Sequence, residues 1–555
     1  MRIAMAQINP TVGDLEGNIE TIEENIDDAK KHHADLVVFP ELSVTGYPPQ
    51  DLLLQSEFVN QNKELLRDLV SHSRDIAGVI GFVDCVGRSL YNAAAVFAGS
   101  RIIDVIYKTL LPTYDVFDED RYFESKGAGE VKPVSVTTAE SQIKLGVEIC
   151  EDLWDEAYDI KVTDLLARAG SDIIINISAS PFYVGKRLER ERLLKTKART
   201  NGVPIFYVNM VGGQDELVFD GQSLAVDSSG DLVARGKQFE EDLIVAEIDL
   251  KKGLGEKVEP PAYSEEEEMF GAIVLGIRDY FRKTGFKKAV VGMSGGIDSS
   301  LTACLACEAL GKDNVVGVSM PSQFSSDHSK TDAKQLAENL GICFVQFPIE
   351  NIVEAYRQAM QQPLQRLRSH FGLEERMDDP VADENIQPRV RGNCLMDISN
   401  RLKDLRLLVL NTGNKTEIAL GYCTLYGDMA GGIGALGDVS KLDVYRLAAY
   451  VNRKMGRDII PRSVLSKKPS PELKPDQFDP FDFDIVSPLV DEVVENRRSM
   501  SELVAMGYPE SIVTDVCRRI RATEYKRRQA APCIKITRKA FGLGWRMPIV
   551  NRYKG

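Results

Sequence analysis

The chain has 555 residues, of which 43% are hydrophobic and 27% are charged, and its formal net charge is -15. A chain of this length and apolar content can bury more than one core, so we expect two or more domains. The acidic balance argues against a general nucleic-acid binder and against a membrane-surface protein. Small-molecule substrates are the expected partners.

Targeting signals and the use of cysteine indicate the cellular compartment in which the protein is expected. The first residues, MRIAMAQINP, resemble a short strand rather than a signal peptide, and no apolar stretch approaches the roughly 20 residues that span a bilayer. The nine cysteines are sparse and irregularly spaced, which is typical of reduced thiols. Cys304 and Cys307 form a C-x-x-C without a second pair, which favours helix packing over a metal site. We expect a cytoplasmic protein.

Residues 1–250 alternate short apolar runs with helical patterns, which predicts an α/β layered domain. Strands are expected at 2–8, 35–40, 79–84, 93–98, 144–150, 172–178, 205–210, 223–230 and 243–250, with helices at 18–32 and 190–202.

Residues 251–263 combine charge, glycine and proline without periodicity, and this composition predicts a linker. Ser264 then precedes four glutamates and an apolar-periodic run, the pattern of a capped helix start. A second domain is therefore expected over residues 264–555. Its apolar runs alternate with helices, which predicts a doubly wound parallel sheet. These strands are expected at 287–294, 315–321, 343–349 and 406–413.

The stretch VVGMSGGIDSSLTACLACEAL, residues 290–310, joins an apolar strand to a helix through a glycine-rich loop. Glycines there let the backbone turn tightly and approach an anion, and Ser299 or Ser300 is expected to cap the helix. The loop predicts a phosphate site. It is not a Walker A loop, because no G-x-x-x-x-G-K-[ST] is present.

Three residues of the first half, Glu41, Lys108 and Cys150, each stand where an apolar strand ends. Strand ends are where α/β folds place working residues. Taken singly, each has an ordinary interpretation, as an exposed acid, a surface lysine and a core cysteine.

Taken together, LVVFPELSVTGYPPQDLL, VIYKTLLPTYDVFDEDRYFE and KLGVEICEDLW resemble the nitrilase, or carbon–nitrogen hydrolase, superfamily in order and spacing. The resemblance implies an α-β-β-α sandwich. It also implies that Cys150 is the nucleophile, Glu41 the general base and Lys108 the oxyanion stabiliser. The chemistry is consistent, since a thiolate attacks an amide carbonyl, a carboxylate transfers the proton and an ammonium stabilises the oxyanion.

SGGIDSS resembles the signature of the ATP pyrophosphatases, or PP-loop enzymes, which cleave ATP between the α- and β-phosphates. Further segments resemble the NAD synthetase family: ENIQPRVRGNCLMDISNRL, VLNTGNKTEIALGYCTLYGDMAGGIGALGDVSKLDVYRLA, PSPELKPDQFD and EYKRRQAAP. Nearly the whole chain therefore resembles the glutamine-dependent NAD⁺ synthetases.

That resemblance implies further site residues. The ATP-binding set is Gly292, Met293, Ser294, Gly295, Gly296, Ile297, Asp298, Ser299 and Thr412; the deamido-NAD⁺ set is Asn385, Glu417, Lys441 and Lys526; the Mg²⁺ ligands are Asp298 and Glu417; and the glutamine-binding set is Tyr114, Ser180 and Lys186. The chain departs from the family pattern at Thr113 and Asp115, where the pattern has Asn and Gly.

The implied reaction uses L-glutamine, ATP and deamido-NAD⁺ as substrates and Mg²⁺ as cofactor. The first domain releases ammonia from glutamine, and the second adenylates the nicotinate carboxylate and lets ammonia displace AMP. The products are NAD⁺, AMP, pyrophosphate and glutamate. A homo-oligomer is expected, at least a dimer through the synthetase domain, with no nucleic-acid or membrane partner.

Two alternatives stay open. Another PP-loop amidotransferase, such as a GMP or asparagine synthetase, carries a glutaminase with a His-containing triad or an N-terminal cysteine, and neither is visible here. A catalytically silent metabolite-binding or filament-forming protein could keep both folds. Intact Glu41, Lys108, Cys150 and SGGIDS argue against it.

Overall fold

The structure is a computed structural model that describes residues 1–138, 142–249, 253–254, 257–259, 261–373, 380–475 and 477–553. The chain divides into two compact units, Met1–Glu268 and Met269–Gly555. The expected boundaries at 250 and 264 stay predictions. Of the expected linker, residues 251–252, 255–256 and 260 lie outside the described residues.

Unit 1 contains, within its described residues, a seven-stranded sheet, a six-stranded sheet and a short two-stranded ribbon. The first sheet has the order β15-β14-β1-β2-β3-β4-β5 and the second the order β13-β12-β9-β8-β7-β6. The strands are β1 Arg2–Gln7, β2 Leu36–Val38, β3 Ala77–Val86, β4 Ser89–Ala98, β5 Arg101–Tyr107, β6 Val134–Thr137, β7 Gln142–Ile149, β8 Ile173–Ser178, β9 Ile205–Asn209, β10 Val211–Gln214, β11 Leu217–Asp220, β12 Leu224–Val226, β13 Leu232–Arg235, β14 Asp242–Asp249 and β15 Gly253–Leu254.

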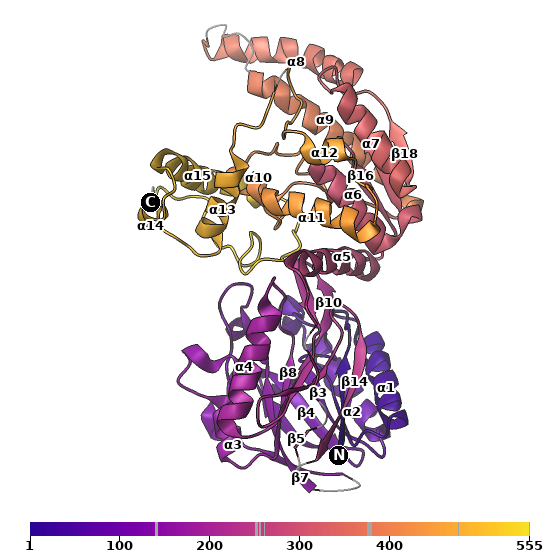
Figure 1. The fold of residues 1–555 in the computed structure, drawn as a ribbon, viewed down its shortest axis with the longest axis vertical. Coiled ribbons are helices and arrows are strands. Elements are labelled where there is room, and N and C mark those ends of the chain that lie inside the picture. The colour runs from indigo at the N-terminus through magenta and orange to yellow at the C-terminus, as the bar shows by residue number, and fades with distance from the viewer. Residues whose placement is uncertain are drawn as a thin grey trace. The chain divides into compact units, whose positions relative to one another are not determined.

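Three apolar clusters explain the layering of unit 1. One lies between the sheets and includes Met5 from β1 and Phe206 from β9. A second packs the outer face of the first sheet against α1 Leu15–Lys31 and α2 Ser56–His72. A third packs the second sheet against α3 Val162–Arg168 and α4 Lys186–Asn201. The result is the predicted α-β-β-α sandwich, with the two pairs of helices on opposite sides of the strands (Figure 1).

The sequence pattern misplaces one strand. The apolar run 223–230 was expected to be continuous, but β12 ends at Val226 and a tight turn follows. The Asp227 carboxylate accepts hydrogen bonds from the N–H groups of Ser229 and Asp231, and Gly230 has a φ of 78°. Short polar side chains that bond to nearby N–H groups compete with a strand ladder, so the chain reverses here into β13.

Unit 2 is built on a five-stranded sheet, within the described residues, of order β18-β17-β16-β19-β20. Every neighbouring pair is parallel, which confirms the predicted doubly wound sheet. The strands are β16 Lys288–Gly292, β17 Val315–Ser319, β18 Cys343–Gln346, β19 Leu407–Asn411 and β20 Ile433–Gly434. The helices are α5 Glu265–Thr284, α6 Ile297–Leu310, α7 Asp327–Leu340, α8 Glu350–His370, α9 Pro380–Arg401, α10 Lys415–Leu420, α11 Lys441–Met455, α12 Arg462–Ser466, α13 Phe483–Val494, α14 Met500–Ala505, α15 Glu510–Ala522 and α16 Glu524–Arg527.

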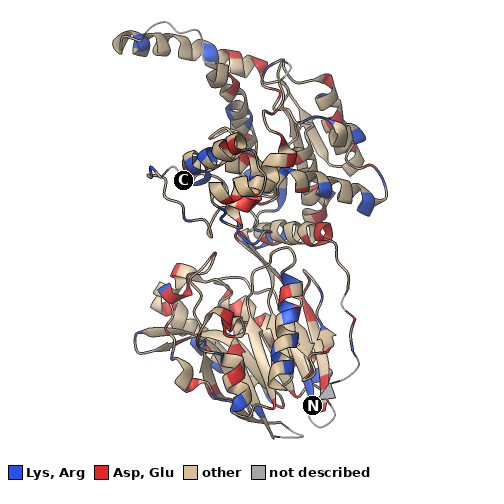
Figure 2. Ribbon diagram, turned by 60° about the vertical axis from the view of Figure 1, so that its left-hand side comes forward, with Lys and Arg blue, Asp and Glu red and all other residues tan. Residues whose placement is uncertain are grey.

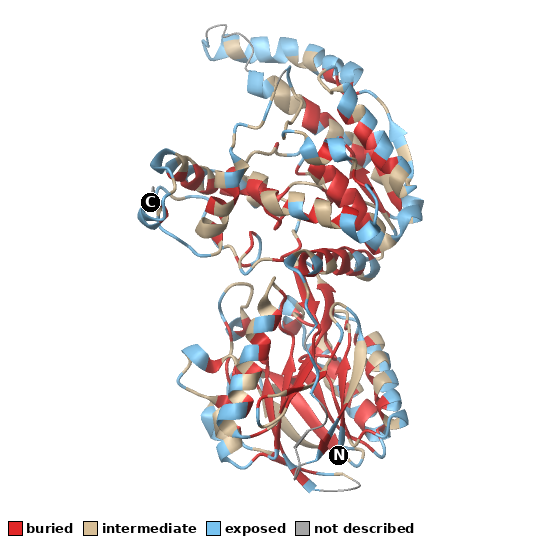
Figure 3. Cartoon of the chain, viewed as in Figure 1, coloured by how far each residue is buried: buried red, intermediate tan, exposed pale blue. Residues whose placement is uncertain are grey.

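The central strands of both units are buried, whereas α8 is exposed along most of its length (Figure 3). Strand order reverses at β16, which pairs with β17 on one side and with β19 on the other. Open parallel sheets bind ligands at such a switch point, beyond the carboxyl ends of the strands.

Both basic residues, Lys and Arg, and acidic residues, Asp and Glu, are spread over the helices of each unit (Figure 2). No helix in the described parts of the chain is long and apolar enough to cross a membrane.

Candidate active site

The three residues singled out in the first half meet at the ends of strands from both sheets. Glu41 follows β2, Lys108 comes directly after β5 and Cys150 comes directly after β7. Gly81 on β3 lets the turn that carries Glu41 pack closely, because a Cβ there would lie 2.4 Å from the Leu42 nitrogen. Sequence positions far apart are thus brought into one buried place.

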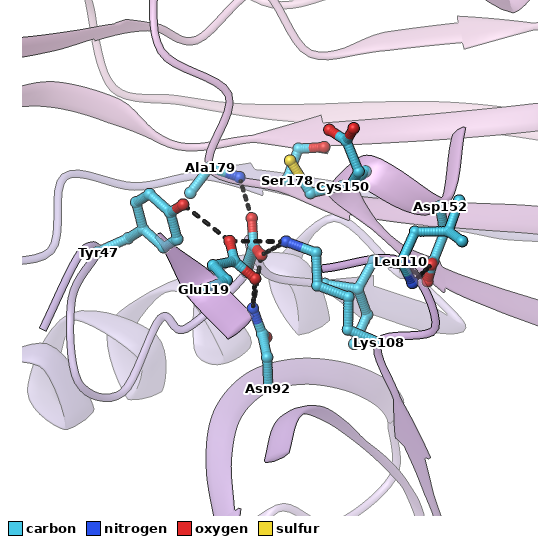
Figure 4. A network of polar contacts seen from close by, with 12 residues as sticks. Tyr47, Asn92, Lys108, Leu110, Glu119, Cys150, Asp152, Ser178 and Ala179 are labelled. Carbon is cyan, nitrogen blue, oxygen red and sulfur yellow. Dashed lines mark hydrogen bonds and ion pairs between the residues drawn. The ribbon is translucent and has the colours of Figure 1, made fainter. Parts of the chain in front are cut away.

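Lys108 is the centre of this site. Its ammonium Nζ lies 2.7 Å from Oε1 of Glu41 and 2.8 Å from Oε1 of Glu119, and all three side chains are buried. Figure 4 shows Lys108, Glu119 and Cys150 gathered together. A buried cation with two charged hydrogen-bond partners is held in one orientation.

Neighbouring groups keep Glu41 and Glu119 in place. Asn92 Nδ2 donates to Glu41 Oε1 at 2.7 Å, and the Ala179 N–H donates to Glu41 Oε2 at 2.9 Å. The Tyr47 hydroxyl donates to Glu119 Oε1 at 2.8 Å. Both carboxylates therefore accept several hydrogen bonds and have little freedom to rotate.

Charge and burial set the protonation of the site. Burial alone would lower the pKa of Lys108, but Glu119 and Glu41 together raise it well above its ordinary value. Burial, followed by the nearby Glu41 charge, raises the pKa of the Cys150 thiol well above its ordinary value. The resting site therefore holds a thiol and an ammonium, and the thiol needs a base to become a nucleophile.

The backbone at Cys150 is unusual. Cys150 has a φ of 47°, in the left-handed region, and begins a short 3₁₀ turn, Cys150–Leu153, directly after β7. A non-glycine residue in this region costs free energy, and such residues cluster at functional sites.

Two acidic residues of this site escape sequence reasoning. Glu119 stands within the run DVFDED, which has the composition of a solvated acidic loop, yet its side chain is buried. Glu151 follows Cys150 directly and is also buried. The only local signal for Glu119 is the apolar Phe117 and Phe123 around it, which indicate that the loop packs inward.

Two of the three predicted glutamine-binding residues, Tyr114 and Lys186, lie near Glu151. The hydroxyls of Tyr114 and Tyr158 donate to the Glu151 carboxylate, at 3.0 Å for the shorter Tyr114 bond and 3.0 Å for Tyr158. The Lys186 ammonium lies 5.2 Å from the centre of the Trp154 ring. Ser180 is buried, and its N–H donates to Asn209 Oδ1 at 3.0 Å. Tyr114 thus contacts the Glu151 carboxylate beside Cys150, and Lys186 lies close enough for its charge to act on that carboxylate.

The backbone conformation explains why aspartate can replace the glycine of the family pattern at position 115. Asp115 has a φ of 50°, in the left-handed region where the family pattern has glycine. Aspartate tolerates this conformation better than most residues, so the loop keeps a turn that suits glycine.

The glycine-rich loop of unit 2 forms the other site. Gly295 has a φ of 79°, and a Cβ there would lie 2.2 Å from the Ser329 carbonyl oxygen, so this position requires glycine. The expected capping by Ser299 or Ser300 is wrong. The N-cap of α6 is Gly296, and both serine hydroxyls donate back to its carbonyl oxygen. Both hydroxyls thus bond the preceding turn, and Ser299 Oγ also accepts from the Ser294 N–H at 3.3 Å, so neither serine caps an N–H group of α6.

A cavity of about 300 Å³ opens at the switch point of the sheet, above β16 and β19. Of the predicted set, it is lined by Gly292, Met293, Ser294, Gly295, Gly296, Ile297, Asp298, Thr412, Glu417 and Lys441. Ser299 lines a smaller cavity of about 130 Å³ that shares Asp298, Thr412 and Glu417 with the first. Sequence reasoning missed four basic residues that line the larger cavity: Lys330, Arg391, Lys467 and Lys468.

Lys441 links the two predicted metal-binding carboxylates. Its Nζ lies 2.6 Å from Asp298 Oδ2 and 3.2 Å from Glu417 Oε1. Asn414, the N-cap of α10, donates to Asp298 Oδ1 at 2.8 Å and accepts from the Glu417 N–H. Burial raises the pKa of Glu417 to about 7, while Lys441 opposes this rise.

Asn385 and Lys526 do not line either cavity. Asn385 Oδ1 accepts from the Thr424 hydroxyl, and the Lys526 ammonium donates to the carbonyl oxygens of Gly421 and Cys423. Both hold the loop between α10 and β20, which contributes Tyr422 and Asp428 to the cavities. The assignment of Asn385 and Lys526 to deamido-NAD⁺ stays a prediction.

The donor set suits Mg²⁺. Within the described residues no group of three or more His, Cys, Asp or Glu side chains forms a ready metal cage. Asp298 and Glu417 nonetheless face one cation, the Lys441 ammonium, beside the phosphate-type loop. Mg²⁺ prefers carboxylate oxygens completed by water and substrate phosphates, so two carboxylates are a fitting protein contribution.

Comparisons with known proteins cover both units of the chain. The family model for carbon-nitrogen hydrolase matches residues 2–253, and the model for NAD synthase matches residues 269–530. The glutamine-dependent NAD(+) synthetase of a Synechocystis strain is 44% identical over 99% of this chain and 99% of its own length. The enzyme of the same name from Thermotoga maritima is 42% identical over 100% of this chain and 99% of its own.

Solved structures agree. The glutamine-dependent NAD⁺ synthetase of Acinetobacter baumannii in complex with adenosine diphosphate is 36% identical, with a TM-score of 0.77 over 99% of this chain and 98% of that chain. A glutamine-dependent NAD(+) synthetase from Cytophaga hutchinsonii, 22% identical, shares the fold with a TM-score of 0.83 over 99% of this chain and 98% of that chain. The motifs, the two folds and the full-length relatives lead to one conclusion: the chain belongs to the glutamine-dependent NAD⁺ synthetase family.

Proposed function

We propose that this protein converts deamido-NAD⁺ to NAD⁺ with ATP, using ammonia released from L-glutamine. The observation that carries the proposal is the presence, on one chain, of a buried Glu41–Lys108 pair beside Cys150 and of a glycine-rich loop that lines a cavity. The first site is suited to amide hydrolysis, and the second is suited to binding a nucleoside triphosphate.

In the glutaminase step, Glu41 takes the Cys150 thiol proton and the sulfur attacks the carboxamide carbon of glutamine. The Lys108 ammonium, held by Glu41 and Glu119, stabilises the oxyanion that forms. The C–N bond then breaks, the proton passes from Glu41 to the leaving nitrogen, and ammonia departs from a glutamyl thioester. Water, deprotonated by the same carboxylate, hydrolyses the thioester to glutamate.

The α-ammonium and α-carboxylate groups of glutamine would be bound by Glu151, Tyr114 and Lys186. The Glu151 carboxylate, already fixed by two tyrosine hydroxyls, is suited to the α-ammonium group, and the Lys186 cation to the α-carboxylate. Opposite charges on the two sides would orient the side-chain amide toward Cys150.

In the synthetase step, the amides of the loop from Ser294 to Asp298 would cradle the phosphates of ATP. Asp298 and Glu417 would hold Mg²⁺, which when bound neutralises charge on the leaving pyrophosphate. Lys441, between these carboxylates, adds a second cation. Asn385 and Lys526 would act on deamido-NAD⁺ through the loop that they support.

Oligomer state is part of the proposal, which expects at least a dimer through the synthetase unit. The experiment that tests the function incubates the protein with glutamine, Mg²⁺-ATP and either deamido-NAD⁺, xanthosine monophosphate or aspartate. We expect AMP to appear only with deamido-NAD⁺, together with equal NAD⁺. AMP formation with another acceptor would support a different amidotransferase, and no AMP at all would support a silent binding protein.

The Cys150→Ala variant separates the two sites. We expect it to lose glutamine-dependent synthesis and to keep synthesis from ammonium chloride, because the thiol serves only the amidase step. Loss of both activities in a folded variant would contradict the assignment of two separate sites.

A further inference from the structure

Asp152 is a buried carboxylate that the proposed chemistry does not use. It stands two residues after Cys150 in the turn Cys150–Leu153, and its side chain is 1% exposed. Oδ1 accepts hydrogen bonds from the N–H groups of Thr109 at 3.0 Å and Leu110 at 2.8 Å. Oδ2 accepts from the N–H of Ile149 at 3.0 Å.

These three N–H groups lie close in sequence to Lys108 and Cys150, the proposed oxyanion stabiliser and nucleophile. Thr109 and Leu110 come directly after Lys108, and Ile149 comes directly before Cys150. Figure 4 shows Asp152 with Leu110 beside the Lys108 and Cys150 side chains. One carboxylate therefore fastens the main chain on both sides of the site.

The bridge joins two sheets that share no strand pairing within the described residues. β5, which precedes Lys108, is the edge of the seven-stranded sheet, while β7, which precedes Cys150, belongs to the six-stranded sheet. The apolar cluster between the sheets holds them face to face, but apolar packing is not directional. Hydrogen bonds to a single carboxylate are directional and set the relative position of the strand ends.

Asp152 stays in this position although burial is unfavourable for a carboxylate. Burial raises the pKa of Asp152 to about 7, and the hydrogen bonds from Ile149, Leu110 and Thr109 oppose that rise. If this position served only packing, an apolar side chain would be more stable there than a buried carboxylate.

We propose that Asp152 is a positioning residue of the glutaminase site, whose carboxylate sets the separation of the Lys108 ammonium from the Cys150 thiol. The inference rests on the proposed function of these two residues and adds a third to it. Reaction rates depend steeply on such distances, since a displacement of about 1 Å can cost about 100-fold.

The decisive variant is Asp152→Asn in the full-length protein. The carboxamide has the same shape but only one acceptor oxygen, so its NH₂ group must face at least one backbone N–H. We expect kcat for glutamine hydrolysis to fall roughly 10- to 100-fold, with KM for glutamine changed by less than about threefold. Synthesis from ammonium chloride reports on the other unit and is expected to stay unchanged.

Asp172→Asn is the matched control. Asp172 Oδ2 accepts from the Lys144 N–H on the same strand, β7, at 2.7 Å, but its side chain is exposed and lies at the opposite end of that strand. We expect this variant to hydrolyse glutamine at the wild-type rate.

Labelling with a chloroketone analogue of glutamine separates alignment from folding. We expect Asp152→Asn to take up one label per chain at Cys150, as the wild type does, but roughly 10-fold more slowly or worse. An Asp152→Asn variant that hydrolyses glutamine with the wild-type kcat overturns the proposal. An Asp152→Asn variant that is labelled at the wild-type rate, but to less than one label per chain, overturns it as well. Should Asp152→Asn not fold, Asp152→Ser undergoes the same labelling, and a wild-type rate in that variant overturns the proposal too.

The wild-type arm tests the proposed function separately. A wild-type protein that neither hydrolyses glutamine nor takes up the label at Cys150 contradicts the glutaminase assignment, and with it the role of Asp152. A reactive wild type with an unaffected Asp152→Asn variant contradicts the positioning role alone.

Discussion

The Lys108 ammonium lies 2.8 Å from the Glu119 carboxylate, which gives the buried cation a second anionic partner besides Glu41. Removing one partner of a buried charge is costly, because the remaining charge is left without compensation. Glu119 therefore holds Lys108 in place without itself being needed as the base.

Glu119→Gln should lower kcat for glutamine hydrolysis by about 10-fold or more, since the ammonium loses one of its two carboxylates. Tyr47→Phe removes only the hydroxyl that donates to Glu119 and should cost less, about fivefold, the effect of one net hydrogen bond. Glutamate release measured by a coupled assay checks both. Glu124→Gln, at an exposed carboxylate of the same segment, serves as the control, and equal losses in all three variants would contradict the assignment.

Asp298→Ala should abolish NAD⁺ formation from glutamine and from ammonium chloride alike. Asp298 faces both the loop cavity and Lys441, and ATP cleavage needs this carboxylate whichever nitrogen source is used. AMP release is the measurement, with Asp313→Ala at an exposed site as the control. The assignment fails if Asp298→Ala still forms AMP at a near-normal rate.

The stability of unit 1 should fall as pH rises, through Glu148. Burial, followed by the charge of Asp152, raises the pKa of Glu148 from 4.5 to about 8. The folded state thus binds a proton that the unfolded state releases, and stability present below pH 4.5 is lost as pH rises toward about 8. The slope is about 1.4 kcal/mol per pH unit for one proton.

Glu148→Gln should remove the contribution of this one proton to the slope, while the contribution of Asp152, whose pKa burial raises to about 7, remains. The chain has two tryptophans, so a Trp545→Phe background leaves Trp154 as a fluorescence probe of unit 1. Denaturant unfolding from about pH 5 to about pH 8.5 gives the free energy of unfolding of both proteins. Parallel pH profiles with and without Glu148→Gln would show that this carboxyl does not titrate as expected.

Ligands of the synthetase site should accelerate glutamine hydrolysis. Deamido-NAD⁺ and ATP would have to bind more tightly to the conformation in which Glu41, Lys108 and Cys150 are aligned. Coupling of about 1–3 kcal/mol corresponds to several-fold to about 100-fold activation. Glutamate release with and without deamido-NAD⁺ plus a non-hydrolysable ATP analogue is the measurement.

Segment 111–124, which follows Lys108 and carries Tyr114, is the candidate for the element that moves. Glu119 in this segment is buried, whereas Tyr114 is 52% exposed, so we expect the movement to lie nearer Tyr114. Identical glutamate release at saturating glutamine, whichever ligands are present, would refute the coupling.

The fold class and several site residues were predictable because local sequence patterns determine them. The strand–glycine–helix pattern of residues 290–310 needs only neighbouring residues to be recognised, and Gly295 has the positive φ that its role requires. The alternation of strands and helices in residues 264–555 determines the parallel sheet in the same way. Glu41, Lys108 and Cys150 were identifiable because each stands beside its own motif.

Only the tertiary structure decided which other groups complete the sites. Glu119 and Asp152 look like ordinary acidic residues in their segments, and both become buried only when the two sheets of unit 1 meet. The tertiary structure also decided the contacts of Asn385 and Lys526, whose hydrogen bonds go to the loop that contributes Tyr422 and Asp428 to the cavities. Sequence patterns record the preferences of neighbouring residues, whereas burial and ion pairing depend on residues distant in the chain that folding brings together.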